Sequence, residues 1–400
     1  MSSGHWENTG EGEIASSSIP RGVWVLGFVS LLMDISSEMI HALLPLYLTV
    51  GLGASALVVG VIEGVAEATA LVVKVFSGAI SDRLRNRKWL TAAGYGLGAL
   101  SKPFFALATG PGLVFAARFA DRIGKGIRGA PRDALIADLV PTSIRGAAYG
   151  LRQSLDTVGA FAGPLLAMAL MLAWNDDFRA VFWVAVAPAI LSFALVVFAV
   201  REPPRRAAPA GRKPATRASI RALGAAFWFV CAAGAALTLA RFSEAFLILR
   251  AQDLGLALAY APLVLVGMNV VFAASAYPLG RLADRVSPRL LLTAGIAALV
   301  AADIVLALAS GLAALAAGVV LWGLHMGCTQ GLLAAMVSHA APEELRGTAF
   351  GVFNLAAGAA MLLASVIAGA LWQYAGPAAT FWAGAALAAA SLAITRWARA

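Results

Sequence analysis

The sequence predicts an all-α membrane protein in which twelve transmembrane helices form two six-helix bundles. Three observations predict this fold class: the composition, the length of the apolar runs and an internal repeat. The 400 residues are 60% hydrophobic and 13% charged, with a mean hydropathy of +0.82. A soluble domain is about 45–50% apolar and about 25% charged. The net charge of +9 falls in short loops between apolar runs, which indicates membrane topology and argues against nucleic-acid binding.

Apolar runs long enough to cross a bilayer follow one another along the chain. A hydrocarbon core of about 30 Å requires about 20 apolar residues in a helix. These runs are too long for the strands of a transmembrane barrel and do not alternate as such strands do. Cutting the chain at charged or Gly/Pro-rich breaks predicts helices at 22–48, 55–80, 89–109, 112–139, 145–173, 178–200, 221–249, 258–283, 287–310, 313–340, 346–372 and 377–396.

Polar segments divide the chain into domains. Residues 1–21 lack the features of a secretory signal and predict a disordered cytoplasmic tail. The segment 201–220 holds four prolines and six Lys or Arg, and predicts a cytoplasmic linker. It separates an N-terminal bundle at 22–200 from a C-terminal bundle at 221–400.

The distribution of Lys and Arg predicts the orientation in the membrane. The loop at 81–88 carries four of them, whereas the loops at 49–54, 110–111, 311–312 and 373–376 carry none. Because basic loops stay on the cytoplasmic side, both termini are expected there. The predicted location is the inner (cytoplasmic) membrane of a bacterial cell.

An internal repeat relates the two halves. Two short sequence motifs of the first half recur in the second half, at offsets of 202 and 201 residues. This recurrence indicates six helices repeated with parallel topology. Transporters whose halves rock about a site at the membrane midplane are built in this way. The recurring residues are Gly78, Asp82, Arg83 and Arg145 in the first half, and Gly280, Asp284, Arg285 and Arg346 in the second.

Three motifs resemble signatures of the major facilitator superfamily. They are Gly78-x-x-x-Asp82-Arg83-x-x-x-Arg87-Lys88 after helix 2, Arg122-x-x-Lys125-Gly126-x-x-Gly129-Ala130 in helix 4, and Gly159-x-x-x-Gly163-Pro164 in helix 5. The last resembles the motif of proton-coupled exporters, although the usual trailing glycines are absent. The resemblance covers about residues 22–396, is strongest to a poorly characterised prokaryotic branch, and implies transport by alternating access.

The resemblance also implies a gating role for the loop after helix 2. Asp82 is expected to face the positive end of a neighbouring helix and to pair with Arg83 or Arg145 in one of two states. Gly78 is expected to allow close helix packing. The helix 5 motif has a structural interpretation, as a small-residue interface with a proline kink, and also predicts a bending point for gating.

Ionisable residues are concentrated in the helices of the first half. A charge at bilayer depth costs about 2.5–3.5 kcal/mol on insertion scales, so each of these residues is a functional candidate. In the second half, Arg241, Glu244 and Asp303 lie at clear depth. The candidates of the first half are Asp34, Glu38 and His41 on helix 1, Glu63 and Glu67 on helix 2, Arg118, Asp121, Arg122, Lys125, Arg128, Arg132 and Asp133 on helix 4, and Arg152 and Asp156 on helix 5.

The basic stripe of helix 4 cannot face lipid. We expect it to line a cavity or to pair with the acids of helices 1, 2 and 5, and a purely structural charge network is the alternative. If rocking moves an acid towards or away from an arginine, its proton affinity changes with conformation. The sequence predicts Glu67 as the leading proton carrier, followed by Asp34 and Glu38, and the family resemblance implies Arg122 as the partner.

These features predict a secondary active transporter of a small solute, powered by the proton gradient, with no bound cofactor. Proton-coupled efflux is the leading hypothesis, and a monomer is expected. The alternative is uptake of an organic anion, or of a metal ion held by Asp34, Glu38, His41 and Glu67. An enzyme is disfavoured because the chain lacks HExxH, GxSxG and Walker-type loops. A soluble domain for a sensor is also absent, and His325, Met326 and Cys328 are expected to pack in a helix core.

Overall fold

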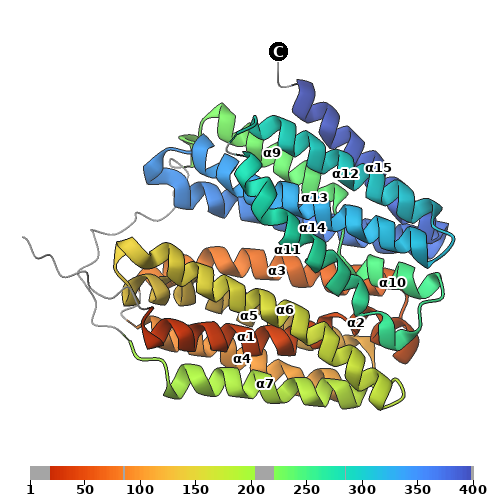
Figure 1. Cartoon of the computed structure of the whole chain (residues 1–400), viewed down its shortest axis with the longest axis horizontal. Helices are drawn as coiled ribbons and strands as arrows, with labels where there is room; N and C mark the ends of the chain where they lie inside the picture. Colours follow the sequence, from red (N-terminus) through yellow and green to blue (C-terminus); the bar gives the residue numbers. More distant parts are fainter. Residues whose placement is uncertain (1–18, 84–85, 203–219, 284, 398–400) are drawn as a thin grey trace, which may run out of the picture.

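The computed structural model describes residues 19–83, 86–202, 220–283 and 285–397, and helices make up most of these ranges (Figure 1). The N-terminal half contains six membrane-length passes. They are formed by α1 (Arg21–His41) with α2 (Leu44–Leu46) and the π-helical turn Tyr47–Gly51, then by α3 (Ala56–Arg83), α4 (Arg87–Leu107), α5 (Pro111–Leu139), α6 (Arg145–Ala173) and α7 (Phe178–Phe198).

The C-terminal half repeats this order. Its passes are α9 (Ala225–Ala240) with α10 (Ala245–Asp253), then α11 (Leu263–Ala283), α12 (Pro288–Leu308), α13 (Leu312–Ala340), α14 (Arg346–Ala375) and α15 (Pro377–Trp397). Short 3-10 turns at Thr142–Ile144, Leu258–Tyr260 and Glu343–Leu345 join successive helices. The described residues therefore make twelve passes, as predicted.

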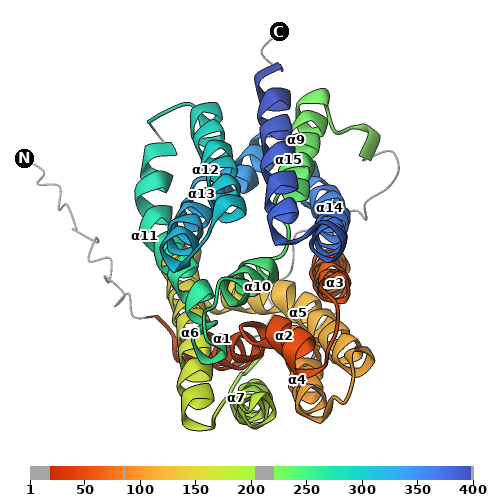
Figure 2. The ribbon, with the colours of Figure 1, turned by 90° about the vertical axis from the view of Figure 1, so that its right-hand side faces the viewer.

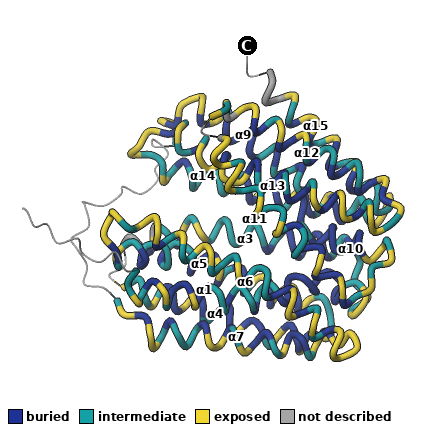
Figure 3. Tube along the Cα trace, viewed as in Figure 1, coloured by how far each residue is buried: buried dark blue, intermediate teal, exposed yellow. Residues whose placement is uncertain are grey.

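Most of these passes are apolar enough to be recognised as membrane spans by composition. Nine helical stretches within the described ranges are long and apolar enough to cross a membrane. The others are α4, the charged α5 and α15, which contributes a shorter apolar stretch at Pro377–Ala393. Exposed residues are distributed along the length of the helices (Figure 3), as expected for a bundle surrounded by lipid.

Two passes are interrupted. The prediction of one continuous helix at 221–249 is wrong, because the seventh pass breaks at Arg241–Glu244, between α9 and α10. Here the Ser243 hydroxyl accepts a hydrogen bond from the backbone N–H of Ala245, the first residue of α10, at 3.2 Å. In the first pass, Pro45 stands just after the end of α1 and lacks the N–H that would continue the helix.

The two bundles meet mainly through two helix pairs, with a further contact between α2 and α10. Within the N-terminal bundle α1 packs against α6 and α7, and α5 packs against α3 and α4. Within the C-terminal bundle α13 packs against α11 and α12, and α12 against α15. The halves touch where α3 lies along α14 and where α6 meets α11 (Figure 2).

The α3–α14 contact is tightest at one end of the molecule. A Cβ added to Gly60 would lie 2.2 Å from the carbonyl oxygen of Ser365, whereas one added to Gly358 would lie 3.5 Å from Ala68. In Figure 1 the bundles meet at the end that holds α2 and α10 and diverge towards the end where the chain begins. We refer to the diverging end as the predicted cytoplasmic side and to the other end as the predicted outer side.

The internal repeat extends to details of packing. An offset of 201 residues relates Ala108, which follows α4, to Ala309, which follows α12. The Ala108 carbonyl accepts a hydrogen bond from Arg179 at 3.0 Å, and the Ala309 carbonyl accepts one from Arg250 at 2.8 Å. Both carbonyls therefore accept from an arginine, although Arg179 of α7 and Arg250 of α10 are not related by the repeat.

Candidate functional site

A buried ion pair joins α5 to α3. Arg118 Nη2 donates to Glu63 Oε2 at 2.8 Å and lies 2.8 Å from Nδ1 of His41 on α1. Arg118 is 1% exposed and Glu63 is 0% exposed. The helix 4 stripe, which lies on α5, was predicted to line a cavity or to pair with acids of helices 1, 2 and 5, and Arg118 pairs with the helix 2 acid Glu63.

A second pair lies one helical turn further along both helices. Arg122 Nη2 is 3.0 Å from Glu67 Oε1. The Arg122 side chain is 6% exposed, but a third of the Glu67 side chain, 33%, is exposed. Because both residues are four positions after the first pair, the contacts form a ladder in which Glu67 is the more accessible acid.

A third buried pair was not predicted. Lys102 Nζ on α4 lies 2.9 Å from Asp121 Oδ1 and 3.0 Å from the Ser37 hydroxyl of α1. The side chains of Lys102 and Asp121 are 1% and 3% exposed. No partner for Asp121 was predicted from the sequence. The sequence feature that could have indicated this pair is the single lysine, Lys102, within the otherwise apolar stretch 89–109.

The packing of α4 on α5 explains the third pair. A Cβ on Gly124 would lie 2.7 Å from the Gly94 carbonyl oxygen and 2.9 Å from the Gly98 nitrogen. The two backbones therefore approach more closely than any side chain would allow. This brings Lys102 within reach of Asp121 and places the Arg128 guanidinium 4.9 Å above the ring of Tyr95.

A second group of charges lies nearer the predicted cytoplasmic side. Arg152 bonds Asp156 at 2.5 Å, one turn apart on α6, and lies 3.8 Å from Asp133 of α5. Arg132 bonds the same Asp133 at 3.2 Å and the hydroxyl of Ser30 at 2.8 Å. The ion pair between these two helices therefore joins an acid of helix 4 to an arginine of helix 5, and not, as predicted, an arginine of the helix 4 stripe to an acid of helix 5.

The glycines of the helix 5 motif, which lies on α6, position two acids of α1. A Cβ on Gly159 would lie 2.9 Å from Cβ of Asp34, and one on Gly163 would lie 2.8 Å from Cβ of Glu38. Both glycines are buried, as is Pro164. The motif therefore acts as the predicted small-residue interface, and its face holds the backbone that carries Asp34 and Glu38.

Charges from the two halves face one another across the molecule. Lys125 of α5 is exposed although it lies at membrane depth. Glu244, at the α9–α10 break, is in the field of Glu38, Glu67 and Lys125 as well as of its neighbour Arg241. The charges of Glu67 and Lys125 are therefore close enough to act on Glu244 of the other bundle. This arrangement favours a polar space between the bundles over contact with lipid.

The predicted gating residues are only partly covered by the structure. The side chains of Asp82 and Arg83, and residue Asp284, lie outside the described residues, so the latch stays a prediction. Arg87 instead bonds Asp138 of α5 at 2.6 Å, and the Glu202 carboxylate accepts from the Arg87 and Lys88 backbone N–H groups at 2.9 and 2.7 Å.

Of the other predicted gating residues, some bond to neighbouring residues and others have no close packing contact. Arg346 donates to the Ser338 carbonyl at 3.2 Å at the junction of α13 and α14. A Cβ on Gly78 would meet Ala130 at an ordinary 3.6 Å, and one on Gly280 would meet nothing within 4 Å. The prediction that Gly78 serves close packing is therefore wrong in this arrangement. Arg145 begins α6, and Arg285 is exposed after α11.

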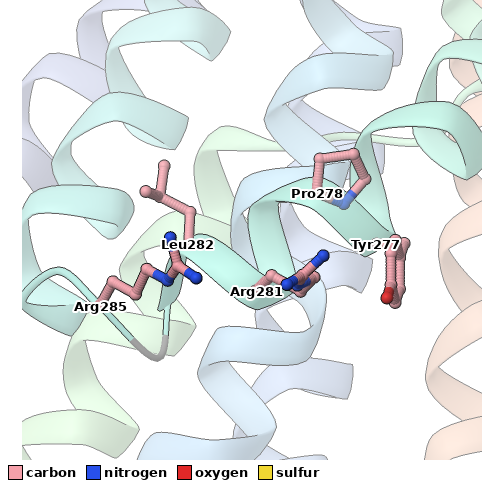
Figure 4. A pocket seen from close by; sticks show the side chains of 5 residues that line it. All are labelled: Tyr277, Pro278, Arg281, Leu282 and Arg285. Atoms are coloured by element: carbon pink, nitrogen blue, oxygen red, sulfur yellow. The ribbon is translucent and has the colours of Figure 1, made fainter.

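Two surface cavities lie away from these charges. One, of about 360 Å³, is formed at the end of α11 by Tyr277, Pro278, Arg281, Leu282 and Arg285 (Figure 4). The other, of about 410 Å³, lies at the predicted outer side between the halves, with Ser55, Trp372 and Gln373 among its lining residues. Neither contains an acid of the ladder.

The geometry gives the metal alternative no support. Within the described ranges, no three His, Cys, Asp or Glu side chains are grouped closely enough to hold a metal ion. On α13, His325 is 1% exposed, and its Nδ1 lies 2.8 Å from the Gly295 carbonyl oxygen. Met326 and Cys328 are also buried, in the apolar core.

Comparison with known proteins decides the family. The sequence model of the Major Facilitator Superfamily matches residues 26–249 and 228–400. The chain belongs to the major facilitator superfamily. A relative in Methanocaldococcus jannaschii, described as an uncharacterized MFS-type transporter, is 31% identical over 92% of this chain and 93% of its own length. This superfamily member is therefore a membrane transporter rather than an enzyme.

Other similarities are narrower. Multidrug resistance protein MdtH of Photorhabdus laumondii is 30% identical over 45% of this chain and 44% of its own length. The nucleoside transporter NupG has the same fold, with a TM-score of 0.78 at 13% identity over 94% of this chain and 99% of that one. A bacterial homologue of the lysosomal transporter Spinster, in an inward-facing conformation, has a TM-score of 0.73 at 18% identity. The match covers 94% of this chain and 95% of that one. At these identities the structures show the fold alone.

Proposed function

We propose that this transporter exports a small solute across the bacterial inner membrane in exchange for protons. The observation that carries the proposal is the Arg122–Glu67 pair, closed at 3.0 Å although 33% of the Glu67 side chain is exposed. An ion pair at membrane depth with one accessible acid can be opened by a proton. The fully buried Arg118–Glu63 pair beneath it has no such access.

Glu67 is the proton carrier in this scheme. When its carboxylate takes up a proton, it loses the charge that binds Arg122, and the guanidinium becomes available to another acid or to substrate. Glu67 lies on α3, the helix that contacts α14 of the other bundle. A change in its charge therefore occurs beside the surface along which the halves move. Asp34 and Glu38 are the second and third candidates.

Export is favoured over uptake by the partial similarity to a multidrug resistance protein and by the exporter-like motif of α6. The substrate and the direction can be found together. We expect metabolite and growth panels on a deletion and overexpression pair to identify a solute that accumulates in cells without the protein. Accumulation in cells that overproduce it would instead indicate uptake.

Substituting Glu67→Gln should abolish accumulation driven by a proton gradient while leaving solute exchange intact. The amide keeps the shape of the acid but cannot cycle between a charged and a neutral form. The measurement uses proteoliposomes with an internal pH-sensitive dye, and compares proton release on solute addition with exchange of labelled solute.

Glu343→Gln serves as the matched control, because Glu343 has a side chain that is 81% exposed and pairs with Arg346 at 3.4 Å on the surface. It should pump normally. If Glu67→Gln pumps as well as the control, Glu67 is not the carrier. If no transported solute changes the internal pH of the wild type, transport is not coupled to protons.

A further inference from the structure

Asp303 of α12 is a buried acid with no partner in the described part of the molecule. It is 0% exposed, and neither carboxylate oxygen has a hydrogen-bond partner. Oδ2 lies 2.6 Å from the position that a Cβ on Gly384 of α15 would occupy, so the glycine leaves room for the carboxyl group. An ionised carboxylate without a cation or donor is strongly unfavourable in such surroundings.

The repeat shows what is missing around Asp303. The offset of 201 residues maps Lys102 onto Asp303, and Asp121 onto Trp322. In the N-terminal bundle Lys102 neutralises Asp121 at 2.9 Å. In the C-terminal bundle an acid replaces the lysine and an indole replaces the acid, so the cation is lost. The Trp322 Nε1 donor is likewise buried without a partner.

Among the described side chains of the neighbouring elements, no charged group compensates for this loss. On α13, which packs against α12, His325 is bound to a backbone carbonyl, and the described side chains of α15 are not titratable. The remaining nearby groups have other partners or face the N-terminal bundle. Arg250 binds Asp253 and the backbone carbonyls of Leu306, Ala307 and Ala309. Arg241 and Glu244 lie at the α9–α10 break.

We propose that Asp303 is a proton-binding site of the C-terminal bundle, separate from Glu67. A protonated carboxyl group is neutral, so it can remain buried without the cost of an unpaired charge. A proton thus supplies the neutralisation that Lys102 supplies in the other half. The site follows from burial and the repeat, and it does not depend on the coupling scheme proposed above.

Phe242 connects this site to the break in the seventh pass. Its ring centroid lies 5.4 Å from that of Trp322, and its Cε1 lies 2.9 Å from the Cβ position of Gly384, beside the carboxyl group. Phe242 is itself one of the residues between α9 and α10. A movement of the break would therefore displace a ring that packs beside Asp303.

Infrared spectroscopy tests the proton directly. Full-length protein in liposomes should show, at pH 7, a carbonyl stretch of a protonated carboxyl group that Asp303→Asn removes. The Glu67→Gln variant should keep this band, because Glu67 belongs to a different site. Absence of an Asp303-dependent band at pH 7 overturns the proposal.

Chemical labelling provides a second test that needs no variant. Dicyclohexylcarbodiimide modifies protonated carboxyl groups in apolar surroundings, and mass spectrometry locates the adduct. We expect the adduct on the α12 peptide that contains Asp303, and a lower yield at high pH. If the infrared band is missing and Asp303 is unlabelled while other buried acids react, Asp303 holds no proton.

Discussion

Arg118→Met should destabilise the folded protein more than any other substitution of a charged residue in the N-terminal bundle. Arg118 bonds the Glu63 carboxylate at 2.8 Å, and Glu63 is 0% exposed with its second oxygen already lacking a partner. Removing one member of a buried pair leaves an uncompensated charge and costs about 3–5 kcal/mol. Thermal unfolding in detergent should show the loss.

The double variant Arg118→Met with Glu63→Gln separates charge from packing. If the uncompensated charge causes the loss, removing it should restore most of the stability. Arg289→Met, at an exposed residue, is the control and should change stability by about 0.5 kcal/mol or less. A double variant as unstable as the single one would show that the guanidinium acts through packing instead.

The helices could be predicted because their boundaries depend on composition alone. The predicted helix at 145–173 coincides with α6, and 112–139 differs from α5 by one residue at the start. Apolar runs end where charged or turn residues would enter the hydrocarbon, so their limits are local. The break at Arg241–Glu244 was missed because a serine inside an apolar run resembles any other small residue.

The partners of the charges were only partly predictable. Glu67 and Arg122 could be matched because both lie near the middle of their helices. Lys102 and Asp121 could not, because their contact depends on how closely α4 approaches α5. That approach is decided by Gly94 and Gly124, whose effect appears only when the two helices are placed together. The depth of a residue in the membrane can be predicted from the sequence, whereas the rotation of each helix about its axis and the distance between helices cannot.

Gly60→Ala should shift the transporter away from the conformation described here and strongly reduce transport. The new Cβ would lie 2.2 Å from the Ser365 carbonyl oxygen of α14, and a backbone atom cannot rotate away as a side chain can. Overpacking of this kind costs about 1–3 kcal/mol. If that cost falls on one of two states, their ratio changes about 5- to 150-fold, and the halves should separate at the predicted outer side.

Spin labels on Ser55→Cys and Gln373→Cys, which line the same outer cavity from opposite halves, would report this separation as a longer distance. Gly358→Ala makes the same chemical change in the same helix pair, but its Cβ would meet Ala68 at an ordinary 3.5 Å. It should leave the distance and transport unchanged. Since the two variants differ in the predicted contact, equal distances in both would mean that close approach at Gly60 does not hold the outer side closed.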